Sequence, residues 1–311
     1  MQFKEKMSEY AMLVETSLKR FLPQIEGEQQ TIAEAARYSL LDGGKRIRPV
    51  LCLAVGDLLD SHREDLLPQR EDLHTSRKDL LPYGCAIEMI HAFSLIHDDL
   101  PCMDNDDYRR GRLTSHKVFG EGIAVLAGDA LINRAYEIML EDCAEHPRKG
   151  KIEAVLGIAA ATGMCGMIGG QTMDLENEHR RISHETLMRM HRMKTGALIK
   201  APVTASCLIC QAPTLESHLL GDYAEAIGLA FQIKDDVLDA TSDRETLGKT
   251  AGKDFAEEKS TYVSLFGLPK AEELLKTTTV DAFRHLDTLK EMGYDTVFLH
   301  GLTEFLLQRK N

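Results

Sequence analysis

Two groups of carboxylates stand at spacings that could hold a divalent cation. The first ends the segment CAIEMIHAFSLIHDD (85–99), in which Glu88, His91 and Asp98 recur at intervals that place them on one face of a helix. Asp98 and Asp99 then stand at the carboxyl end of this predicted helix, where the macrodipole disfavours each negative charge by about 0.3 to 1 kcal/mol. A bound cation would reverse that cost.

The loop after this segment mixes acids with arginines. Its charged residues are Asp104, Asp106, Asp107, Arg109, Arg110 and Arg112. Carboxylates beside arginines indicate a site at which metal ions bridge to phosphate groups, because Mg²⁺ prefers oxygen ligands and Arg binds phosphate oxygens in pairs. The alternative is a solvated acidic loop whose charge the arginines balance.

A second group of carboxylates favours the metal-bridged interpretation. In FQIKDDVLDATSD (231–243), Gln232, Asp239 and either Asp235 or Asp236 recur at helical spacing on an otherwise apolar helix. Like charges placed in this way repel one another, and Mg²⁺ relieves the repulsion. Because Mg²⁺ takes one or two carboxylates together with water and substrate oxygens, two such groups could hold one diphosphate between them.

Several basic residues could bind the anion. They are Lys45, Arg46 and Arg48 in GGKRIRP, Lys194 in MKTG, and Lys249, Lys253 and Lys259. None belongs to a P-loop, because GGKR lacks the GxxxxGK[ST] spacing and Asp243 stands where the pattern around Lys249 needs its first glycine. The sequence therefore disfavours a nucleoside triphosphatase. Each lysine taken alone could equally be an exposed surface residue, so the inference depends on the combination.

Composition limits the partners and the compartment. The chain has 37 Lys and Arg against 49 Asp and Glu, and its net charge of −12 gives no support to non-specific nucleic-acid binding. The amino-terminal segment does not resemble a secretory signal, and no uncharged apolar run reaches about 18 residues, so we expect a cytoplasmic protein without a transmembrane segment. The CxxC spacing of Cys207 and Cys210 predicts a buried helical face rather than a metal or redox site.

The elements that carry these residues are predicted to be helices. Ala, Leu, Met, Glu and Lys dominate, only nine prolines occur, and no sustained alternation indicates strands. We therefore expect an all-α protein, with one domain over residues 1–311 and the charged groups in loops at 42–45, 100–119 and 241–257. The predicted helices span 3–21, 29–41, 46–60, 83–99, 120–143, 150–168, 183–210, 215–239, 258–265, 268–290 and 294–309.

A threefold repeat at a period of seven residues occupies 63–82. Three short copies are too few for a coiled coil, and Pro68 and Pro82 would interrupt a helix. The repeat therefore predicts a flexible, solvated inserted loop at about 61–82, without a chemical role.

The motifs together resemble the trans-prenyl diphosphate synthases, particularly the bacterial farnesyl and the plant-type geranylgeranyl diphosphate synthases. The resemblance covers nearly the whole chain and runs through GGKRIRP, EMIHAFSLIHDDLPCMDNDDYRRG, the Gly128-Asp129 pair, GGQTMD, MKTG, FQIKDDVLD and LGKTAGKD. It implies a single large helical bundle around a central substrate cavity, the isoprenoid synthase fold, and a homodimer. It also implies Mg²⁺ as the cofactor, three ions with substrate bound, with Mn²⁺ as an alternative.

The resemblance also implies roles for individual residues. The magnesium ligands would be Asp98, Asp99, Asp104, Asp235, Asp236 and Asp239. Arg109 would contact the allylic diphosphate, and the isopentenyl diphosphate would be bound by Lys45, Arg48, His91 and Arg110. The leaving diphosphate would be steadied by Lys194, Lys249 and Lys259, and the developing cation would be faced by Thr195 and Gln232. Which of Lys249, Lys253 and Lys259 reaches the pyrophosphate is left open by the sequence.

The expected reaction joins isopentenyl diphosphate to dimethylallyl or geranyl diphosphate and releases pyrophosphate. In the family, a bulky residue five positions before the first aspartate closes the pocket for the growing chain; Phe93 holds this position, with Ser94 beside it. The resemblance therefore favours the fifteen-carbon farnesyl product over the alternative, geranylgeranyl. On a helical wheel Ser94 shares the face of Asp98 while Phe93 lies about 140° away, so a core phenylalanine is the competing interpretation.

Three other functions fit less well. A class I terpene cyclase does not need a second diphosphate site, and Lys45, Arg48 and Arg110 argue against it. A non-catalytic subunit of a heteromeric synthase would be expected to lose its acidic motifs, and both are intact. A calcium-binding EF-hand fails because Arg109 stands where the loop starting at Asp104 needs glycine.

Overall fold

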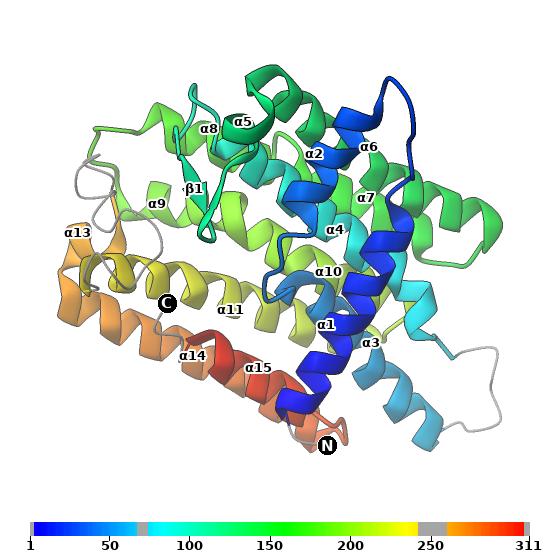
Figure 1. The fold of residues 1–311 in the computed structure, drawn as a ribbon. Helices are drawn as coiled ribbons and strands as arrows, with labels where there is room; N and C mark the ends of the chain where they lie inside the picture. The colour runs from blue at the N-terminus through cyan, green and yellow to red at the C-terminus, as the bar shows by residue number, and fades with distance from the viewer. Residues whose placement is uncertain (1–2, 67–73, 242–259, 308–311) are drawn as a thin grey trace.

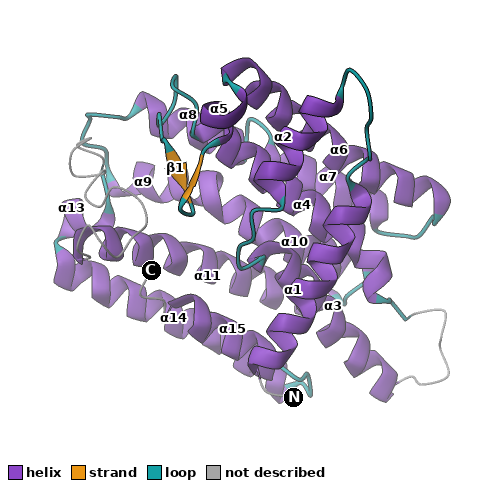
Figure 2. Cartoon of the chain, in the orientation of Figure 1, coloured by secondary structure: helices purple, strands orange, loops and turns teal. Residues whose placement is uncertain are grey.

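The computed structural model describes residues 3–66, 74–241 and 260–307. Helices make up most of this part of the chain, and the only strands within it form a two-stranded hairpin (Figure 2). In chain order the elements are α1 (Phe3–Phe21), α2 (Gln30–Leu40), α3 (Ile47–Leu66), α4 (Arg77–Asp98), β1 (Tyr108–Arg109), β2 (Arg112–Leu113), α5 (Ser115–Phe119), α6 (Glu121–Glu145), α7 (Lys151–Thr162), α8 (Met167–Glu176), α9 (His184–His191), the π-helix η2 (Arg192–Gly196), α10 (Ala197–Ile209), α11 (Thr214–Thr241), α13 (Tyr262–Phe266), α14 (Leu268–Glu291) and α15 (Val297–Leu307).

The all-α prediction is confirmed, with several local differences. The expected helix over 150–168 is two helices, α7 and α8, because Gly163 ends the first and Gly166 precedes the second. The expected helix over 183–210 contains a π-helical turn at η2. Within the loop expected at 100–119, residues 108–113 form the hairpin β1–β2, in which Tyr108 pairs with Leu113.

The inserted loop expected at 61–82 is in part helical, which corrects that prediction. Helix α3 extends to Leu66 and α4 begins at Arg77, so the first and third copies of the repeat contribute helical ends. A capping box between Ser76 and Asp79 starts α4, and Pro82 lies in the second turn of this helix, where its missing N–H costs one intrahelical bond. The residues between, 67–73, lie outside the described part.

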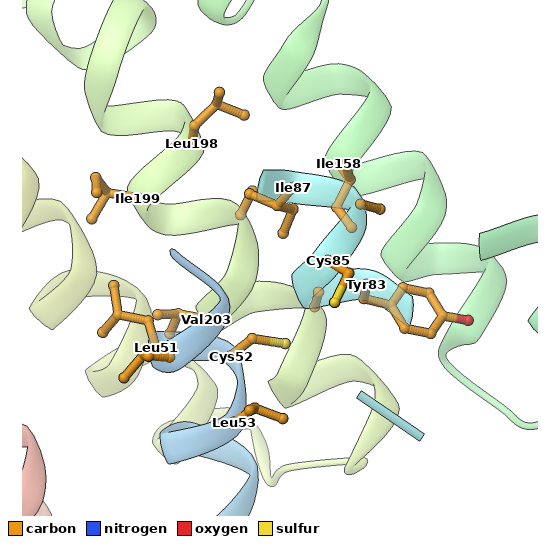
Figure 3. Packing of buried hydrophobic residues seen from close by; sticks show 14 of the residues in the cluster. Leu51, Cys52, Leu53, Tyr83, Cys85, Ile87, Ile158, Leu198, Ile199 and Val203 are labelled. Atoms are coloured by element: carbon orange, nitrogen blue, oxygen red, sulfur yellow. The ribbon is translucent and has the colours of Figure 1, made fainter. Parts of the chain in front are cut away.

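Helix α4 is the central element of the bundle (Figure 1). Every residue from 80 to 90 is buried, and the helix packs against α3, α6 and α10. A helix that is apolar around its whole circumference must be covered on every side to keep that surface out of water. Figure 3 shows this contact, with Leu51 of α3, Ile87 of α4 and Val203 of α10 in the same core. The charged end of α4, which carries Asp98, is thereby fixed relative to its neighbours.

A second, smaller core holds the carboxyl-terminal half of α11. It consists of Leu187, Met190, Ile233, Val237, Tyr262 and Ala271. These residues come from α9, α11, α13 and α14, so this cluster positions the part of α11 on which the second acidic group lies.

The cysteines are free thiols, and the predicted burial of the CxxC pair is confirmed. Cys207 and Cys210 are both buried at the end of α10, and burial raises the pKa of the Cys210 thiol to about 11. Two helical stretches, 77–98 and 151–176, are long and apolar enough to cross a membrane by composition alone. In the first, 78% of the apolar window is buried inside the molecule, as is typical of the core helix of a folded domain; in the second, the share is 33%.

Gly150 allows α7 to begin against the end of α10, and this generates a stability prediction. It has φ of +90°, and a Cβ there would lie 2.0 Å from the Leu208 carbonyl oxygen. We expect Gly150→Ala to destabilise the protein by about 2 kcal/mol or more, because the left-handed backbone and the backbone clash both act against the side chain. Urea unfolding followed by circular dichroism measures the effect.

Gly157 on the same helix is the matched control. A Cβ there meets nothing within 4 Å, so Gly157→Ala is expected to stabilise α7 by about 0.5 to 1 kcal/mol through helix propensity. Equal effects of the two substitutions would contradict the close approach described for Gly150.

Candidate active site

A cavity of about 530 Å³ lies between α4, α6, α8 and η2. This volume is in the range of small-molecule binding sites. The cavity brings together seven residues selected from the sequence: Arg48, His91, Phe93, Ser94, Asp98, Lys194 and Thr195. Apolar side chains of α8 and α10 complete the wall, namely Met167, Ile168, Leu175 and Leu198. One chamber thus joins charged groups to an apolar space.

The first acidic group lies at the end of α4 and is linked to the hairpin. Asp99 is buried and accepts hydrogen bonds from Arg109, whose Nε lies 2.8 Å from both carboxylate oxygens. Burial lowers the pKa of Arg109, but the hydrogen bonds and charge of Asp99 outweigh it, so the net pKa of Arg109 is raised. The Asp104 amide donates to the Asp98 carbonyl over 2.8 Å, which folds the loop back towards the helix end.

Asp98 has the electrostatic character of a cation ligand. Burial raises the pKa of its carboxyl group to about 6; Lys194 acts in the opposite direction, and Asp104 and Asp99 raise it further. A half-buried carboxylate held next to other carboxylates is stabilised by a divalent cation, and its hard oxygen atoms suit Mg²⁺. Within the described ranges, no three His, Cys, Asp or Glu residues converge closely enough to hold a metal alone. The residues therefore fit an ion that completes its coordination with water and diphosphate oxygens.

Positive charge gathers around His91. Arg48 Nε is buried and has no hydrogen-bond partner among the described residues, and burial lowers the pKa of this guanidinium, with Arg110 acting in the same direction. Burial, followed by Arg48 and Arg110, lowers the pKa of His91 well below 6.5, so this ring is neutral near pH 7. Buried cationic groups that repel one another bind an anion with little further loss of hydration, which is the property required of a diphosphate site.

The glycine-rich loop before α3 fixes these cations. Gly43 and Gly44 have φ of +74° and +120°, and a Cβ on Gly44 would lie 2.8 Å from Arg110 Nη1. Arg110 Nη1 donates to the Gly43 carbonyl over 2.6 Å. Lys45 is exposed, and its Nζ lies 5.3 Å from the ring centre of Phe305. The structure therefore brings Arg48 and His91 into the cavity wall and leaves Lys45 outside it.

Arg46 and Glu88 form a buried ion pair that the sequence did not predict, although it placed Arg46 among the candidate anion-binding residues. Arg46 is buried, adopts φ of +49°, and donates to Glu15 over 2.5 Å, to Glu88 over 2.9 Å and to the Leu40 carbonyl over 2.7 Å. These contacts hold the residue between Lys45 and Arg48 in a left-handed conformation that non-glycine residues rarely adopt. The sequence signal for Glu88 was its place on the polar face with His91 and Asp98.

Lys194 and Thr195 are presented by the π-helical turn η2. Such turns are frequent at functional sites because they turn side chains out of the regular helical register. Lys194 Nζ donates to Asp174 of α8 over 2.6 Å. Gly170 permits this close packing, since a Cβ there would lie 2.2 Å from the Lys194 backbone nitrogen. Asp174, within the GGQTMD motif, is thus a further residue whose contact with the site the sequence did not reveal.

The second acidic group lies on α11, against which η2 also packs. Asp236 is buried and accepts a hydrogen bond of 2.7 Å from the Tyr262 backbone N–H, so one of its oxygens fixes α13. Asp235, Asp239 and Gln232 are half-buried, and none of these α11 residues lines the cavity described above. Their assigned roles stay predictions. The predicted lysines at the pyrophosphate, Lys249 and Lys259, and the alternative Lys253 lie outside the described residues.

The two residues selected for chain length both reach the cavity. Phe93 is buried, and its ring lines the chamber rather than only the core, so the helical wheel underestimated its access. The cavity extends around α4, from the helix face that carries Asp98 to the face that carries Phe93, so side chains on both faces line it. Ser94 also lines the cavity and donates to the His91 carbonyl over 2.9 Å.

The raised pKa of Asp98 generates a prediction about pH. Because the folded-state value exceeds the ordinary value of 3.8, the folded protein binds this proton more tightly than the unfolded chain does. The metal-free protein therefore loses stability as pH rises from about 4 to about 6, by about 2 to 3 kcal/mol at most. Asp98→Asn removes the charge and is expected to be more stable than the unsubstituted protein at pH 7 in EDTA, with no difference below pH 4.

Unfolding in urea across this pH range measures the difference. Mg²⁺ with pyrophosphate should raise the melting temperature of the unsubstituted protein more than that of Asp98→Asn. An Asp98→Asn variant that is less stable than the unsubstituted protein at pH 7 in EDTA, with a difference that disappears as pH falls, would show that the carboxylate is stabilised, not destabilised, in the metal-free site.

Known proteins share both the sequence and this arrangement. The polyprenyl synthetase family model matches residues 29–292. A farnesyl diphosphate synthase of Escherichia coli (strain K12) is 39% identical over 311 residues, which cover 99% of each chain. A chloroplastic geranylgeranyl pyrophosphate synthase of Capsicum annuum is 39% identical over 313 residues, 99% of this chain and 79% of that protein. The crystal structure of an FPP/GFPP synthase from Zymomonas mobilis matches with a TM-score of 0.82 at 34% identity and 98% coverage of both chains. The predicted isoprenoid synthase fold is thereby confirmed, and the chain belongs to the polyprenyl synthetase family.

Proposed function

We propose that this prenyltransferase condenses isopentenyl diphosphate with dimethylallyl or geranyl diphosphate and releases farnesyl diphosphate as its main product. The observation that carries the proposal is the composition of the cavity of about 530 Å³. Cationic Arg48, neutral His91, acidic Asp98 and basic Lys194 all line it, together with the aromatic ring of Phe93 and apolar side chains of α8 and α10. This arrangement suits two diphosphates and one growing hydrocarbon chain.

The allylic diphosphate is held beside the two acidic groups. Asp98, Asp99 and Asp104, with Asp235 and Asp239 of α11, supply the oxygen atoms that would hold Mg²⁺. When bound, Mg²⁺ neutralises diphosphate charge and so favours heterolysis of the allylic C–O bond. Lys194 is positioned to bind the departing pyrophosphate, whose charge is greater than that of the ester, and this difference lowers the barrier.

The isopentenyl diphosphate is held by Arg48 and His91 of the cavity and by Arg110, which lines an adjoining pocket together with His91. Neutral His91 can donate one N–H to an oxygen of this diphosphate while the arginines supply the charge. Fixing both substrates in one water-poor chamber brings the isopentenyl double bond to the allylic carbon, and such positioning lowers the barrier by several kcal/mol. The proton lost from the new cation goes to the released pyrophosphate.

Product length is the finer part of the proposal. The relatives include both farnesyl and geranylgeranyl synthases at the same identity, so they do not separate the two products. Phe93 supports farnesyl, because an aromatic ring in the apolar wall limits the chain that fits there. A class I cyclase fits less well, because it has no use for the second anion site at Arg48 and Arg110.

Product analysis tests the proposal. Purified protein is incubated with Mg²⁺, isopentenyl diphosphate and either starter, and the products are separated by mass spectrometry. We expect mainly farnesyl diphosphate, and Phe93→Ala should shift most of the product to geranylgeranyl or longer, because it opens the apolar wall. Mainly geranylgeranyl from the unsubstituted protein would overturn the length assignment, and no condensation with either starter would favour the cyclase or a non-catalytic subunit.

We also propose that the protein works as a homodimer formed through α6 and α7. These helices pack against each other and expose large apolar side chains: Leu126 (55%), Leu140 (51%), Ile152 (52%) and Leu156 (64%). Apolar groups gathered on neighbouring helices commonly mark an association surface.

Sedimentation velocity measures the oligomeric state. We expect a dimer, and Leu156→Lys should weaken it by about tenfold or more in the dissociation constant, because it places a charge in an apolar contact. Val297→Lys is the matched control, since Val297 is exposed to a similar degree (73%) on α15. A monomeric unsubstituted protein, or equal effects of the two variants, would contradict the proposed interface.

A further inference from the structure

His97 lies against Phe93 in the wall of the cavity. Both side chains line the chamber, and they are one helical turn apart on α4. Their rings meet edge to face, with centroids 4.8 Å apart and planes at 76°. This is a favourable geometry for two aromatic rings, since the positive edge of one meets the negative face of the other. The orientation of the Phe93 ring is therefore coupled to the position of the His97 ring.

The His97 ring is itself fixed by α6. Its Nε2 lies 3.0 Å from the Val125 carbonyl oxygen. A carbonyl can only accept, so Nε2 carries the hydrogen and donates it. Asp129 Oδ1 lies 3.9 Å from the same nitrogen, which favours the same orientation. The ring thus bridges α4 and α6 while its other side supports Phe93.

Gly128 provides the space that this bridge needs. A Cβ at this position would lie 2.3 Å from His97 Nε2 and 2.5 Å from Cδ2. The glycine is buried in the interior of α6, where it destabilises a helix by roughly 1 kcal/mol relative to alanine. Its φ is not positive, so the backbone does not require glycine here, and the reason for it is the His97 ring.

We propose that His97 is a positioning residue for product length, which holds the Phe93 ring across the cavity and is itself held by the Val125 carbonyl above the notch at Gly128. The inference rests on the proposed function, since it concerns how the synthase limits chain elongation. Without His97, the Phe93 ring loses its supporting edge and can turn towards α6 into the vacated space. The cavity then accepts a longer chain although Phe93 is still present.

Two independent substitutions disturb this contact. His97→Ala removes the supporting ring, and Gly128→Ala leaves His97 intact but displaces its ring with a Cβ. Each is expected to raise the ratio of twenty-carbon to fifteen-carbon product by about fivefold or more, which corresponds to the loss of one aromatic contact. Because the readout is the ratio of two prenyl diphosphate products, it does not depend on the overall turnover rate. Gly122→Ala, also on α6 with nothing within 4 Å of the added Cβ, should leave the ratio unchanged.

A double substitution distinguishes support of Phe93 from simple enlargement of the cavity. If His97 acts through Phe93, then His97→Ala combined with Phe93→Ala gives the same ratio as Phe93→Ala alone. An additive effect would overturn the positioning role. An unchanged ratio in both His97→Ala and Gly128→Ala would also overturn it.

A spectroscopic readout keeps the inference separate from the proposed function. In protein labelled with 4-fluorophenylalanine, the Phe93 ¹⁹F resonance is assigned as the one lost in Phe93→Ala. His97→Ala and Gly128→Ala should shift this resonance, while Gly122→Ala should not. If the Phe93 resonance did not shift in either variant, the support of Phe93 by His97 would be refuted, even if the protein proved to be inactive. If geranylgeranyl diphosphate were the main product of the unsubstituted protein, the farnesyl assignment would be overturned, but the ring contact would not.

Discussion

The active site depends on the burial of α4. Residues 80–90 are enclosed on every side, so the hydrophobic effect fixes this helix and its neighbours α3, α6 and α10 as one unit. The polar residues of α4 become useful because of that rigidity: Glu88 and His91 meet the cations of the glycine-rich loop, and Asp98 and Asp99 emerge where the helix ends. One apolar helix thereby sets the distance between the anion-binding residues around His91 and the carboxylates of Asp98 and Asp99 at its end.

The ion pair of Arg46 with Glu88 connects this helix to the loop that carries Arg48. Both partners are buried, with side chains 2% and 4% exposed, so loss of either partner would leave an uncompensated charge and cost about 3 to 5 kcal/mol. Among the negative charges that act on Arg48 and Arg110, Glu88 has the largest effect on their pKa values, and it opposes the lowering caused by burial. A buried carboxylate therefore holds together a group of cations that would otherwise repel one another, and those cations remain available to a diphosphate.

Two other cations of the site are paired with carboxylates in this structure. Arg109 binds Asp99, and Lys194 binds Asp174. These pairs keep the charges satisfied inside a site with little water, where an unpaired charge is costly. Under the proposed function, a diphosphate with its metal ions would offer both partners a replacement, because the anion can take the arginine or lysine while the cation takes the carboxylate.

The sequence predicted most of the fold because the helices follow local rules. The ends of α1 and α2 agree with the predicted ranges to within a residue, since an apolar periodicity and polar boundaries define them. Hairpin β1–β2 was missed because two-residue strands have no period to detect. The aspartates and Arg48 were found from their types and spacing, but the contacts of Arg46, Asp174 and Gly128 were not predicted, because they are made with residues distant in sequence. Phe93 shows the same limit: a helical wheel cannot show that a cavity extends around a helix.

A crystal structure with Mg²⁺, isopentenyl diphosphate and a non-ionisable thio analogue of geranyl diphosphate would test the central claim most directly. We expect the diphosphate group of isopentenyl diphosphate to lie against Arg48 and Arg110. The diphosphate of the analogue should lie beside Asp98 and Lys194, with its hydrocarbon chain directed at Phe93. Isopentenyl diphosphate bound away from Arg48, or a hydrocarbon chain directed away from Phe93, would contradict this claim.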